Sequence, residues 1–548
     1  MTTDTTPKIL IVGAGPCGLT LALAAQRNGI AVRIIEKSPI PAISQRGAGI
    51  QPRTQELFRA LGVLDAVNKH AILTPRIQTY VLPEGVVPLK TFDTVPLLKP
   101  TASCPSLSLL CLGQNQLEFI LRAALRKYSC EVEFGSELRS LTQDADGVDA
   151  TIVKQDGQDK IERYDFVVGT DGARGIVRKR LGLSLFGESR PSINLITGDV
   201  RVEGIDIDYW HMWGEMKTDC VFLRPTEVAG LFHLMLASSQ CNYQELINDH
   251  DALQKGIAKI TGRGDIRIVQ VVSIAQWTAN IRMVDTFQAG RCFVAGDAAH
   301  VHSPFGGQGM NSGVQDSFNL AWKLALVQRG LAPTTLLDSY THERVPVIRE
   351  MLDATTRLLN RTVQANAAGT DLSHWDRSGP LAMLGVNYRW SSIVVDERDD
   401  PTAAKVATNG YGIQYTDLRA GDRAPDTPAL KDIHTGETKH LFDVFDAARH
   451  TVLVFSASPK RISTVIQVLS RLPKDSVRCA AIVPSGSAAD LHAPEMMLED
   501  TQGHAYSNYV FNGACDIAVV RPDFVLGALV SSSEALERYF GQIFVVDR

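Results

Sequence analysis

Residues 8–36 carry the sequence feature that most constrains the fold. A short β-rich run, KILIV (residues 8–12), stops at Gly13-Ala14-Gly15-Pro16-Cys17-Gly18, a helical pattern follows, and a second strand ends on Glu36. This order of strand, tight turn, helix, strand and terminal acid is the full context that a dinucleotide fingerprint requires. The pattern therefore predicts a βαβ unit that binds a dinucleotide.

Each residue of this turn has a physical role in such a unit. Gly13 permits the turn, Gly15 lets backbone N–H groups approach a pyrophosphate, and Gly18 lets the helix lie close to the sheet. With Pro16 in the same turn, the helix N-terminus presents its unpaired N–H groups and the positive end of its dipole. We expect Glu36 to accept hydrogen bonds from an adenosine ribose, which favours FAD or NAD over NADP.

Bulk properties exclude several classes of protein. The apolar run at residues 9–25 is short for a membrane span and contains the glycine turn, so we expect neither a span nor a signal peptide. Acidic and basic residues are mixed along a chain of net charge −5, which disfavours nucleic acid as a partner. Nine cysteines without a C-x-x-C pair indicate reduced thiols, and we expect a cytoplasmic protein.

Two later strands also end in turn residues. FVVG is followed by Thr170-Asp171-Gly172, and RCFVA is followed by Gly296-Asp297 and the glycine-rich run PFGGQGMN at residues 304–311. An amphipathic pattern then predicts a helix that starts near Asn311 or Ser312. Asp297, His300 and His302 have a spacing that a metal site could use, but the strand, the glycines and the helix favour a polyol partner for Asp297. We therefore predict no metal.

The three motifs together resemble the class A flavoprotein monooxygenases, the group of para-hydroxybenzoate hydroxylase and phenol hydroxylase. The resemblance implies an α/β fold. It combines a Rossmann-like FAD-binding domain of the GR2 type with an inserted β-rich substrate domain. The implied boundaries are 1–73, 111–185 and 286–366 for the FAD-binding domain and 74–110 and 186–285 for the substrate-binding domain.

By this resemblance, FAD lies in an extended pose across the motifs. The turn of residues 13–18 holds its pyrophosphate, Glu36 its adenosine ribose, and Asp297 its ribityl chain and pyrophosphate. The glycine segment supplies N–H groups and a helix dipole to the flavin pyrimidine carbonyl. Gly175 replaces a serine that is common after the D-G motif, which puts a side-chain hydrogen bond from that position in doubt. The other cofactor-binding residues that the resemblance implies are Arg46, Gln114, Asp171, Pro304, Gly307, Gly309, Met310 and Asn311.

The resemblance also implies a reaction. NAD(P)H reduces FAD, and a flavin hydroperoxide formed with O2 then hydroxylates a phenolic or aromatic substrate. Because the chain has one dinucleotide fingerprint, NAD(P)H is expected to bind only transiently, as a co-substrate. A substituted phenol, a hydroxybenzoate with oxidative decarboxylation, and an aromatic polyketide of secondary metabolism all fit. A Baeyer–Villiger or epoxidising monooxygenase of the same fold, and a non-catalytic FAD-fold binding protein, remain alternatives. A flavin-dependent halogenase is disfavoured because the chain lacks a G-W-x-W-x-I-P segment.

Two alternating runs supply candidates for substrate contact. YWHMWG places Tyr209, His211 and Trp213 on one face of a strand, and GLFHLML does the same for His233 and its alternate neighbours. We expect His211 and Tyr209 to be the catalytic residues that orient a phenol, with His233 and then Arg224 as weaker candidates. The alternative is that these are sheet aromatics packed around a histidine whose hydrogen bonds are satisfied.

The C-terminal third opens a new pattern of short strands and helices. Residues 367–415 are polar and predict a linker, and residues 416–548 resemble the thioredoxin-like domain of the phenol hydroxylase branch through G-D-R-A-P (residues 421–425) and R-P-D (residues 521–523). Because this domain has no C-x-x-C pair, we expect it to be structural, with homodimer contacts as one role open to it.

Overall fold

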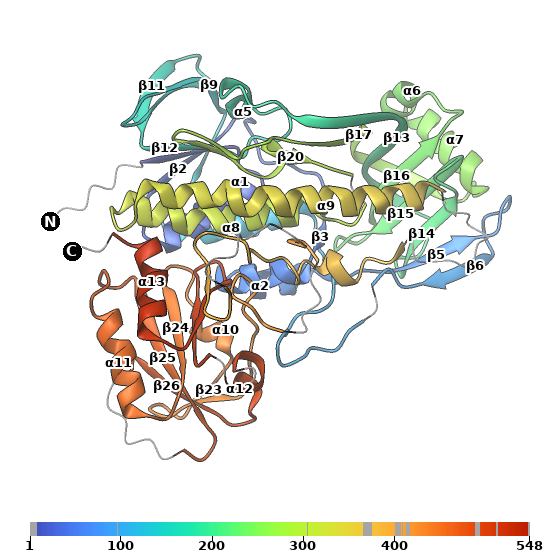
Figure 1. The fold of residues 1–548 in the computed structure, drawn as a ribbon. Helices are drawn as coiled ribbons and strands as arrows, with labels where there is room; N and C mark the ends of the chain where they lie inside the picture. The colour runs from blue at the N-terminus through green and yellow to red at the C-terminus, as the bar shows by residue number, and fades with distance from the viewer. Residues whose placement is uncertain are drawn as a thin grey trace.

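The computed structural model describes residues 8–545 except 96, 304, 365–374, 401–406, 408, 413–416, 488–493, 511, 512 and 514. Figure 1 shows three parts: a layered α/β part at the centre, a sheet covered by α6 (Tyr243–Asn248) and α7 (His250–Thr261) to its right, and a C-terminal sheet with its own helices below it. In the part of the chain that the structure describes, no helix has the length and apolar character needed to cross a membrane.

The central sheet gathers strands from three separate stretches of the chain. Its order is β18-β19-β12-β1-β2-β8, and β1 runs parallel to β2 and β12, which in turn runs parallel to β19. Because parallel strands end at the same edge, the three sequence motifs that follow β1, β12 and β19 lie side by side. The strands are β1 (Ile9–Val12), β2 (Val32–Glu36), β8 (Val132–Phe134), β12 (Phe166–Gly169), β18 (Gln288–Ala289) and β19 (Cys292–Val294).

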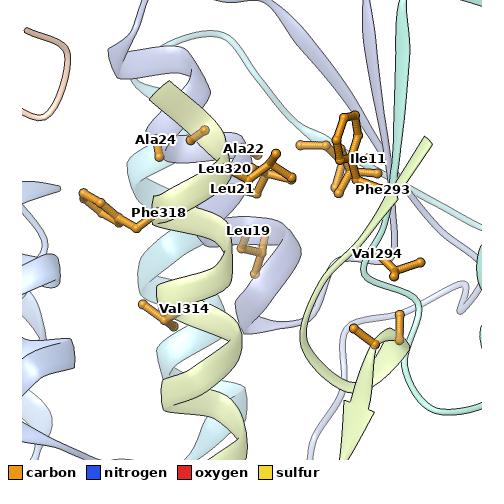
Figure 2. Close-up of a cluster of buried hydrophobic side chains, with 14 of the residues drawn as sticks. Ile11, Leu19, Leu21, Ala22, Ala24, Phe293, Val294, Val314, Phe318 and Leu320 are labelled. Carbon is orange, nitrogen blue, oxygen red and sulfur yellow. The ribbon is translucent and has the colours of Figure 1, made fainter. Parts of the chain in front are cut away.

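Two buried helices pack against each other beside this sheet. Alanine and leucine predominate in α1 (Pro16–Arg27), which contacts β1 and β2, and α8 (Gly309–Gln328), which is buried along most of its length, packs on α1. Figure 2 shows Leu19 of α1, Phe318 of α8 and Phe293 of the sheet in one buried cluster. The long helix α9 (Asp338–Gln364) runs beside α8 (Figure 1).

The second sheet has two different faces. Its order is β20-β17-β13-β16-β15-β14-β5-β6, and the helices α6 (Tyr243–Asn248) and α7 (His250–Thr261) pack on one face. We call the other face the inner face, because Met235 and Trp277 on it also pack against the central part of the molecule. The strands are β5 (Arg76–Tyr80), β6 (Pro88–Phe92), β13 (Phe186–Glu203), β14 (Tyr209–Gly214), β15 (Asp219–Pro225), β16 (Leu231–Ser238), β17 (Arg267–Met283) and β20 (His300–Val301).

The C-terminal sheet has the order β21-β28-β27-β24-β25-β26-β22-β23. Within it, β24 pairs parallel with β25 and antiparallel with β27, and all nine cysteines of the chain are free thiols. The assignment of a thioredoxin-like domain stays a prediction. The elements are β21 (Val395–Asp396), β22 (Leu430–Asp432), β23 (Thr438–Lys439), β24 (His450–Phe455), β25 (Val477–Pro484), β26 (Met496–Asp500), β27 (Ile517–Val520), β28 (Leu526–Val530), α10 (Leu441–Val444), α11 (Pro459–Leu469), α12 (His504–Tyr509) and α13 (Ser533–Ile543).

Smaller elements complete the fold. Two sheets of three strands have the orders β3-β7-β4 and β11-β10-β9. Their strands and the remaining helices are β3 (Gly49–Ile50), β4 (Ile72–Leu73), β7 (Leu110–Cys111), β9 (Ser136–Gln143), β10 (Val148–Lys154), β11 (Asp159–Tyr164), α2 (Pro52–Ala60), α3 (Leu64–His70), α4 (Gln114–Arg126) and α5 (Ile176–Arg180), with the 3-10 turns η1 (Gly296–Ala298), η2 (Thr334–Leu337) and η4 (Gly379–Ala382).

Part of the predicted linker is packed into the fold. Trp390 and Ser391 are buried, the Trp390 indole donates to the carbonyl of His342 at 2.9 Å, and the Ser391 hydroxyl donates to Glu343 at 2.7 Å. The strand β21 joins the C-terminal sheet beside β28. These residues of the predicted linker are thus part of the packed fold, because their indole and hydroxyl groups hydrogen-bond to α9.

The buried ring of His450 gives the stability of the protein a specific pH dependence. It is 1% exposed, packs against Trp322 and Tyr539, and burial lowers its pKa to about 3. In the unfolded chain the pKa returns to about 6.5, so this contribution to stability is full above that pH and is lost as the pH falls toward 3. Between pH 6.5 and pH 5, the variant His450→Leu should therefore lose about 2 kcal/mol less of its free energy of unfolding than the wild type does.

Urea unfolding of both proteins at these two pH values measures the difference. The exposed His434, between β22 and β23 of the same sheet, offers the control, and His434→Leu should keep the wild-type pH dependence. If the free energies of unfolding of wild type and His450→Leu depended equally on pH, His450 would not be the group responsible for this pH dependence.

Candidate active site

The glycines of the first turn have two different surroundings. A Cβ atom on Gly13, whose φ is +105°, would lie 2.5 Å from the carbonyl oxygen of Thr170, and one on Gly18 would lie 2.1 Å from the carbonyl oxygen of Gly13. A Cβ on Gly15 would meet no atom of the described residues within 4 Å. Gly13 and Gly18 thus allow α1 and β12 to approach closely, and Gly15 faces open space at the N-terminus of α1, where a pyrophosphate fits.

Glu36 is fixed beside this turn at the end of β2. One carboxylate oxygen accepts a hydrogen bond from the backbone N–H of Ala14 at 3.0 Å, and the other accepts one from the N–H of Ser38 at 2.9 Å. The structure therefore brings this acid to the glycine turn, as the motif requires. That its carboxylate also binds a ribose stays a prediction.

Asp297 extends into open space from a buried segment. Its neighbours Gly296 and Ala298 are buried, whereas Asp297 itself is exposed. The surrounding protein displaces water from the carboxyl of Asp297 and so raises its pKa. The charges of His300 and Arg46 lower this pKa but do not cancel the rise. The structure shows no hydrogen bond from a described residue to this carboxylate, so it is available to the hydroxyl groups of a polyol.

The two histidines after Asp297 have protein partners. The Nε2 of His300 and a carboxylate oxygen of Asp316 are 2.8 Å apart, and the other oxygen of Asp316 accepts from Arg344 at 2.7 Å. Although burial raises the pKa of Asp316, Arg344 and His300 lower it to about 2. Burial lowers the pKa of His302 to about 4, and its ring hydrogen-bonds to the carbonyl of Ser303. No cluster of potential metal ligands occurs among the residues described.

The glycine-rich segment leads into α8. Gly307 has a φ of +63°, and a Cβ on Gly309 would lie 2.5 Å from the Nε2 of His302, so both positions favour glycine. The Asn311 side chain accepts from the N–H of Gln51 at 2.9 Å and donates to the carbonyl of Gly307. Asn311 thus holds the segment in place through backbone groups. Pro304, also predicted to contact the cofactor, lies outside the described residues.

Residues predicted to lie around the flavin ring come together at Gly47. A Cβ placed there would lie 3.7 Å from the Cβ of Met310 and 3.9 Å from the Oε1 of Gln114. Arg46 precedes it, is exposed, and has the uncommon φ of +24°. Gln114 begins α4 and donates to Glu118 at 2.9 Å. Contacts of these side chains with FAD stay predictions.

The carboxylate of Asp171 hydrogen-bonds to the backbone that follows it in the chain. One carboxylate oxygen accepts from the N–H groups of Ile176 and Val177 at 2.6 and 3.1 Å, which caps α5. A Cβ on Gly175 would lie 2.2 Å from the other oxygen, so this arrangement of Asp171 explains why glycine stands at that position. A contact between Asp171 and a cofactor stays a prediction.

His211 is buried on the helix-covered face of the second sheet. It is 0% exposed, its Nδ1 lies 2.6 Å from the Tyr80 hydroxyl, and its Nε2 lies 3.0 Å from the carbonyl of Asp206. It stacks on Trp213, and Tyr209 meets its edge on the same face. The expectation that His211 orients substrate is therefore wrong, because both ring nitrogens are occupied and the ring is buried on the covered face. The role predicted for Tyr209, which is half-buried, stays a prediction.

The inner face carries the two weaker candidates and an acid that sequence reasoning missed. Asp199 lies opposite His233 in the pairing of β13 with β16, and Arg224 lies opposite His233 in the pairing of β15 with β16. Directly opposite residues point to the same side of a sheet, so the three form one row. Apolar side chains surround this row, namely Leu195, Trp210, Met212, Phe222, Met235 and Trp277.

A hydrogen-bond chain runs along this row. The Nδ1 of His233 lies 2.8 Å from Asp199, and its Nε2 lies 3.1 Å from the hydroxyl of Thr197. Asp199 also accepts from the Ser273 hydroxyl at 2.8 Å and from the backbone N–H of Gln45 at 2.9 Å. Because Gln45 precedes Arg46, the acid connects the inner face to the loop predicted to contact the flavin.

The charges in this chain set its protonation. Burial would raise the pKa of Asp199, but the hydrogen bond and charge of His233 outweigh it and lower that pKa. Burial lowers the pKa of His233, Asp199 raises it, and Arg224 lowers it again, so the net shift is downward. At neutral pH the acid is therefore a carboxylate that accepts from Nδ1, and the neutral ring presents Nε2 as an acceptor toward Thr197.

The local sequence carried no signal for the missed acid. In LITGDVRV, Asp199 alternates with Thr197 and Arg201, whereas the apolar residues Ile196, Val200 and Val202 take the other positions. Such alternation is typical of a strand with one polar side facing solvent, so only the structure shows that Asp199 is buried.

Comparison with known proteins gives consistent matches. A family model described as an FAD binding domain matches residues 6–355. A flavin-dependent monooxygenase from Mycobacteroides abscessus is 35% identical over 486 residues, which are 87% of this chain and 94% of that protein. Pentachlorophenol 4-monooxygenase from Sphingobium chlorophenolicum is 27% identical and covers 94% and 92% of the two chains. The solved ternary complex of aklavinone-11 hydroxylase with FAD and aklavinone superposes with a TM-score of 0.80, at 25% identity over 99% of this chain and 100% of that one.

Proposed function

This chain belongs to the class A FAD-dependent aromatic monooxygenases, and from that membership we propose that it hydroxylates a phenolic substrate bound against the inner face, with NAD(P)H as electron donor. The observation that carries the proposal is the Thr197, His233 and Asp199 chain. It places a neutral imidazole on an apolar face and ties that face to the loop of Arg46. The name of the pentachlorophenol enzyme supports a phenol as the substrate class.

The residues present fit FAD. Gly15 leaves space at the helix N-terminus for the pyrophosphate, Asp297 offers a carboxylate that accepts no hydrogen bond from the described residues, and Met310 in the first turn of α8 lies beside the loop of Gly47. When bound, FAD supplies the activation of O2 that inserts one oxygen atom into the ring.

The contribution of the chain itself is to draw the proton from the substrate. We propose that a phenol donates its hydrogen bond to the Thr197 hydroxyl, which in turn donates to Nε2 of His233, so that the imidazole takes up a proton as the phenol becomes a phenolate. Asp199 keeps Nδ1 protonated and stabilises the resulting imidazolium. A phenolate is more electron-rich at its ortho and para carbons, and the apolar walls exclude water from it.

Turnover by the purified yellow protein tests the proposal. Substituted phenols should stimulate NAD(P)H oxidation and give products that carry one oxygen atom from labelled O2. Loss of carbon dioxide from a hydroxybenzoate would indicate oxidative decarboxylation at the same site. Turnover of ketones in place of phenols, or a protein that binds no flavin, would overturn it.

Replacing His233 with glutamine should lower kcat for a protonated phenol by roughly 100-fold, since the proton acceptor of the chain is lost. A substrate that is already a phenolate should be affected far less. Steady-state rates with phenols of high and low acidity separate the two cases. His250→Gln, an exposed change on α7, is the control. Equal losses for both kinds of phenol would show that His233 acts only in packing.

A further inference from the structure

The side chain of Gln308 is buried in the middle of the glycine-rich segment. It is 0% exposed, and its Nε2 donates to the carbonyls of Gly306 at 2.7 Å and Leu381 at 3.0 Å, while its Oε1 accepts from the hydroxyl of Tyr411. Because a carbonyl can only accept, these three partners allow a single orientation of the amide. The hydroxyl comes from far along the chain, 103 residues after Gln308 and inside the predicted linker.

The carbonyl groups of the segment are turned toward side chains of the protein. Gly306 also accepts from the Gln51 side chain at 3.1 Å, and Gly307 accepts from Asn311 at 2.6 Å. Because the C=O and N–H of one trans peptide point in opposite directions, the N–H groups of Gly307 and Gln308 point away from these partners. Neither N–H donates to a described residue. The segment thus offers two backbone donors on its other side, where we predict the flavin.

Tyr411 is held by contacts outside the glycine-rich segment. The residue is 3% exposed, its N–H donates to Glu350 of α9 at 3.0 Å, and the carbonyl of Gly410 accepts from the N–H of Asn387 at 2.9 Å. Burial raises the pKa of the Tyr411 hydroxyl, so this group stays a protonated donor at neutral pH. The hydroxyl therefore has a fixed position from which it orients the Gln308 amide.

From these contacts we infer that Tyr411 is a positioning residue for the flavin, which acts through Gln308 on the backbone donors of the segment. The inference rests on the proposed function for the placement of the flavin against this segment. Backbone donors stabilise a negative charge best when they are fixed before the charge develops. The flavin ring gathers such charge when it is reduced, so loss of the Tyr411 hydroxyl should weaken the binding of reduced FAD more than that of oxidised FAD.

The midpoint potential of the bound flavin tests the inference. In Tyr411→Phe, which removes only the hydroxyl, we expect the affinity for reduced FAD to fall roughly tenfold relative to that for oxidised FAD, as a weakened hydrogen bond to a charged group predicts. This ratio lowers the two-electron potential by about 30 mV. Reductive titration of the FAD-loaded protein against a reference dye measures the potential, and urea unfolding of the apoprotein measures stability separately.

Two further variants make the result specific. Tyr509 of α12 is also 3% exposed, and its hydroxyl donates to the carbonyl of Pro425 at 2.6 Å, so Tyr509→Phe removes a matched hydroxyl and should leave the potential unchanged. Gln308→Leu should lower the potential as Tyr411→Phe does. The double variant of Tyr411 and Gln308 should lower it no further, because the hydroxyl acts through the amide.

The inference is overturned if Tyr411→Phe keeps the wild-type potential, if Tyr509→Phe lowers it equally, or if the effects of Tyr411→Phe and Gln308→Leu add in the double variant. If Tyr411→Phe binds no FAD, wild-type stability of its apoprotein supports the inference, whereas a collapsed fold overturns it. The proposed function fails separately. A lowered potential in a protein that inserts oxygen into no phenol would refute the function alone.

Discussion

Replacement of Gly15 with alanine is expected to abolish tight FAD binding while leaving the protein folded. The backbone there has a φ of −72° and a ψ of −179°, which alanine adopts without strain, and its methyl group would meet no described atom within 4 Å. The methyl group would instead occupy the space where the pyrophosphate approaches the backbone. We expect the affinity for FAD to fall at least roughly 100-fold, equivalent to about 3 kcal/mol, measured by titration of the apoprotein.

Two comparisons make this result specific. Gly264→Ala also places a methyl group in open space, but in a surface loop, and should leave the affinity for FAD unchanged. Gly18→Ala would be uninformative, because its Cβ would clash with the carbonyl of Gly13 and disturb the fold itself. If Gly15→Ala purified with bound flavin at the wild-type ratio, the pyrophosphate assignment would be untenable.

Replacement of Arg521 with methionine is expected to destabilise the protein by about 3–5 kcal/mol, the usual cost of breaking a buried ion pair from one side. Its guanidinium donates to both oxygens of Glu343 at 2.7 and 3.0 Å and to Asp523, and all three side chains are buried. Lys323 of α8 donates to the same carboxylate at 2.8 Å. The cluster balances two cations against two carboxylates, and methionine would leave one negative charge in excess in the interior.

Urea unfolding followed by tryptophan fluorescence measures this loss. Arg471, just after α11, provides a control, since it forms a 2.7 Å ion pair with Glu537 in which both side chains are exposed. Arg471→Met should cost less than about 1 kcal/mol. If the two substitutions lowered the free energy of unfolding equally, the buried cluster would contribute no more stability than a surface ion pair.

Local motifs explain why the cofactor side was predictable from sequence. Gly13, Gly18 and Glu36 act within one βαβ unit, so their roles follow from short-range geometry, and the structure brings Asp297 to the same sheet edge because β1, β12 and β19 are parallel. The chemistry at each strand end could be inferred because neighbouring parallel strands end together.

The substrate side was not predictable in the same way. The alternation of Tyr209, His211 and Trp213 was correct, but alternation alone does not say which face helices will cover. That choice depends on α7, which packs from 40 residues farther along the chain. The partners of Asp199 likewise come from β16, β17 and the loop of Gln45, and no local pattern links them.

The two faces of the second sheet divide its residues into separate groups for protein engineering. Even-numbered positions of β14 and β15, such as Met212 and Phe222, line the inner face, while their odd-numbered neighbours Trp213 and Leu223 form the core beneath α7. A directed-evolution library confined to the inner-face positions would change the shape offered to a substrate and leave the helix-covered core intact. If the proposed function is correct, alternate positions of these few strands are therefore the ones at which to vary the substrate range.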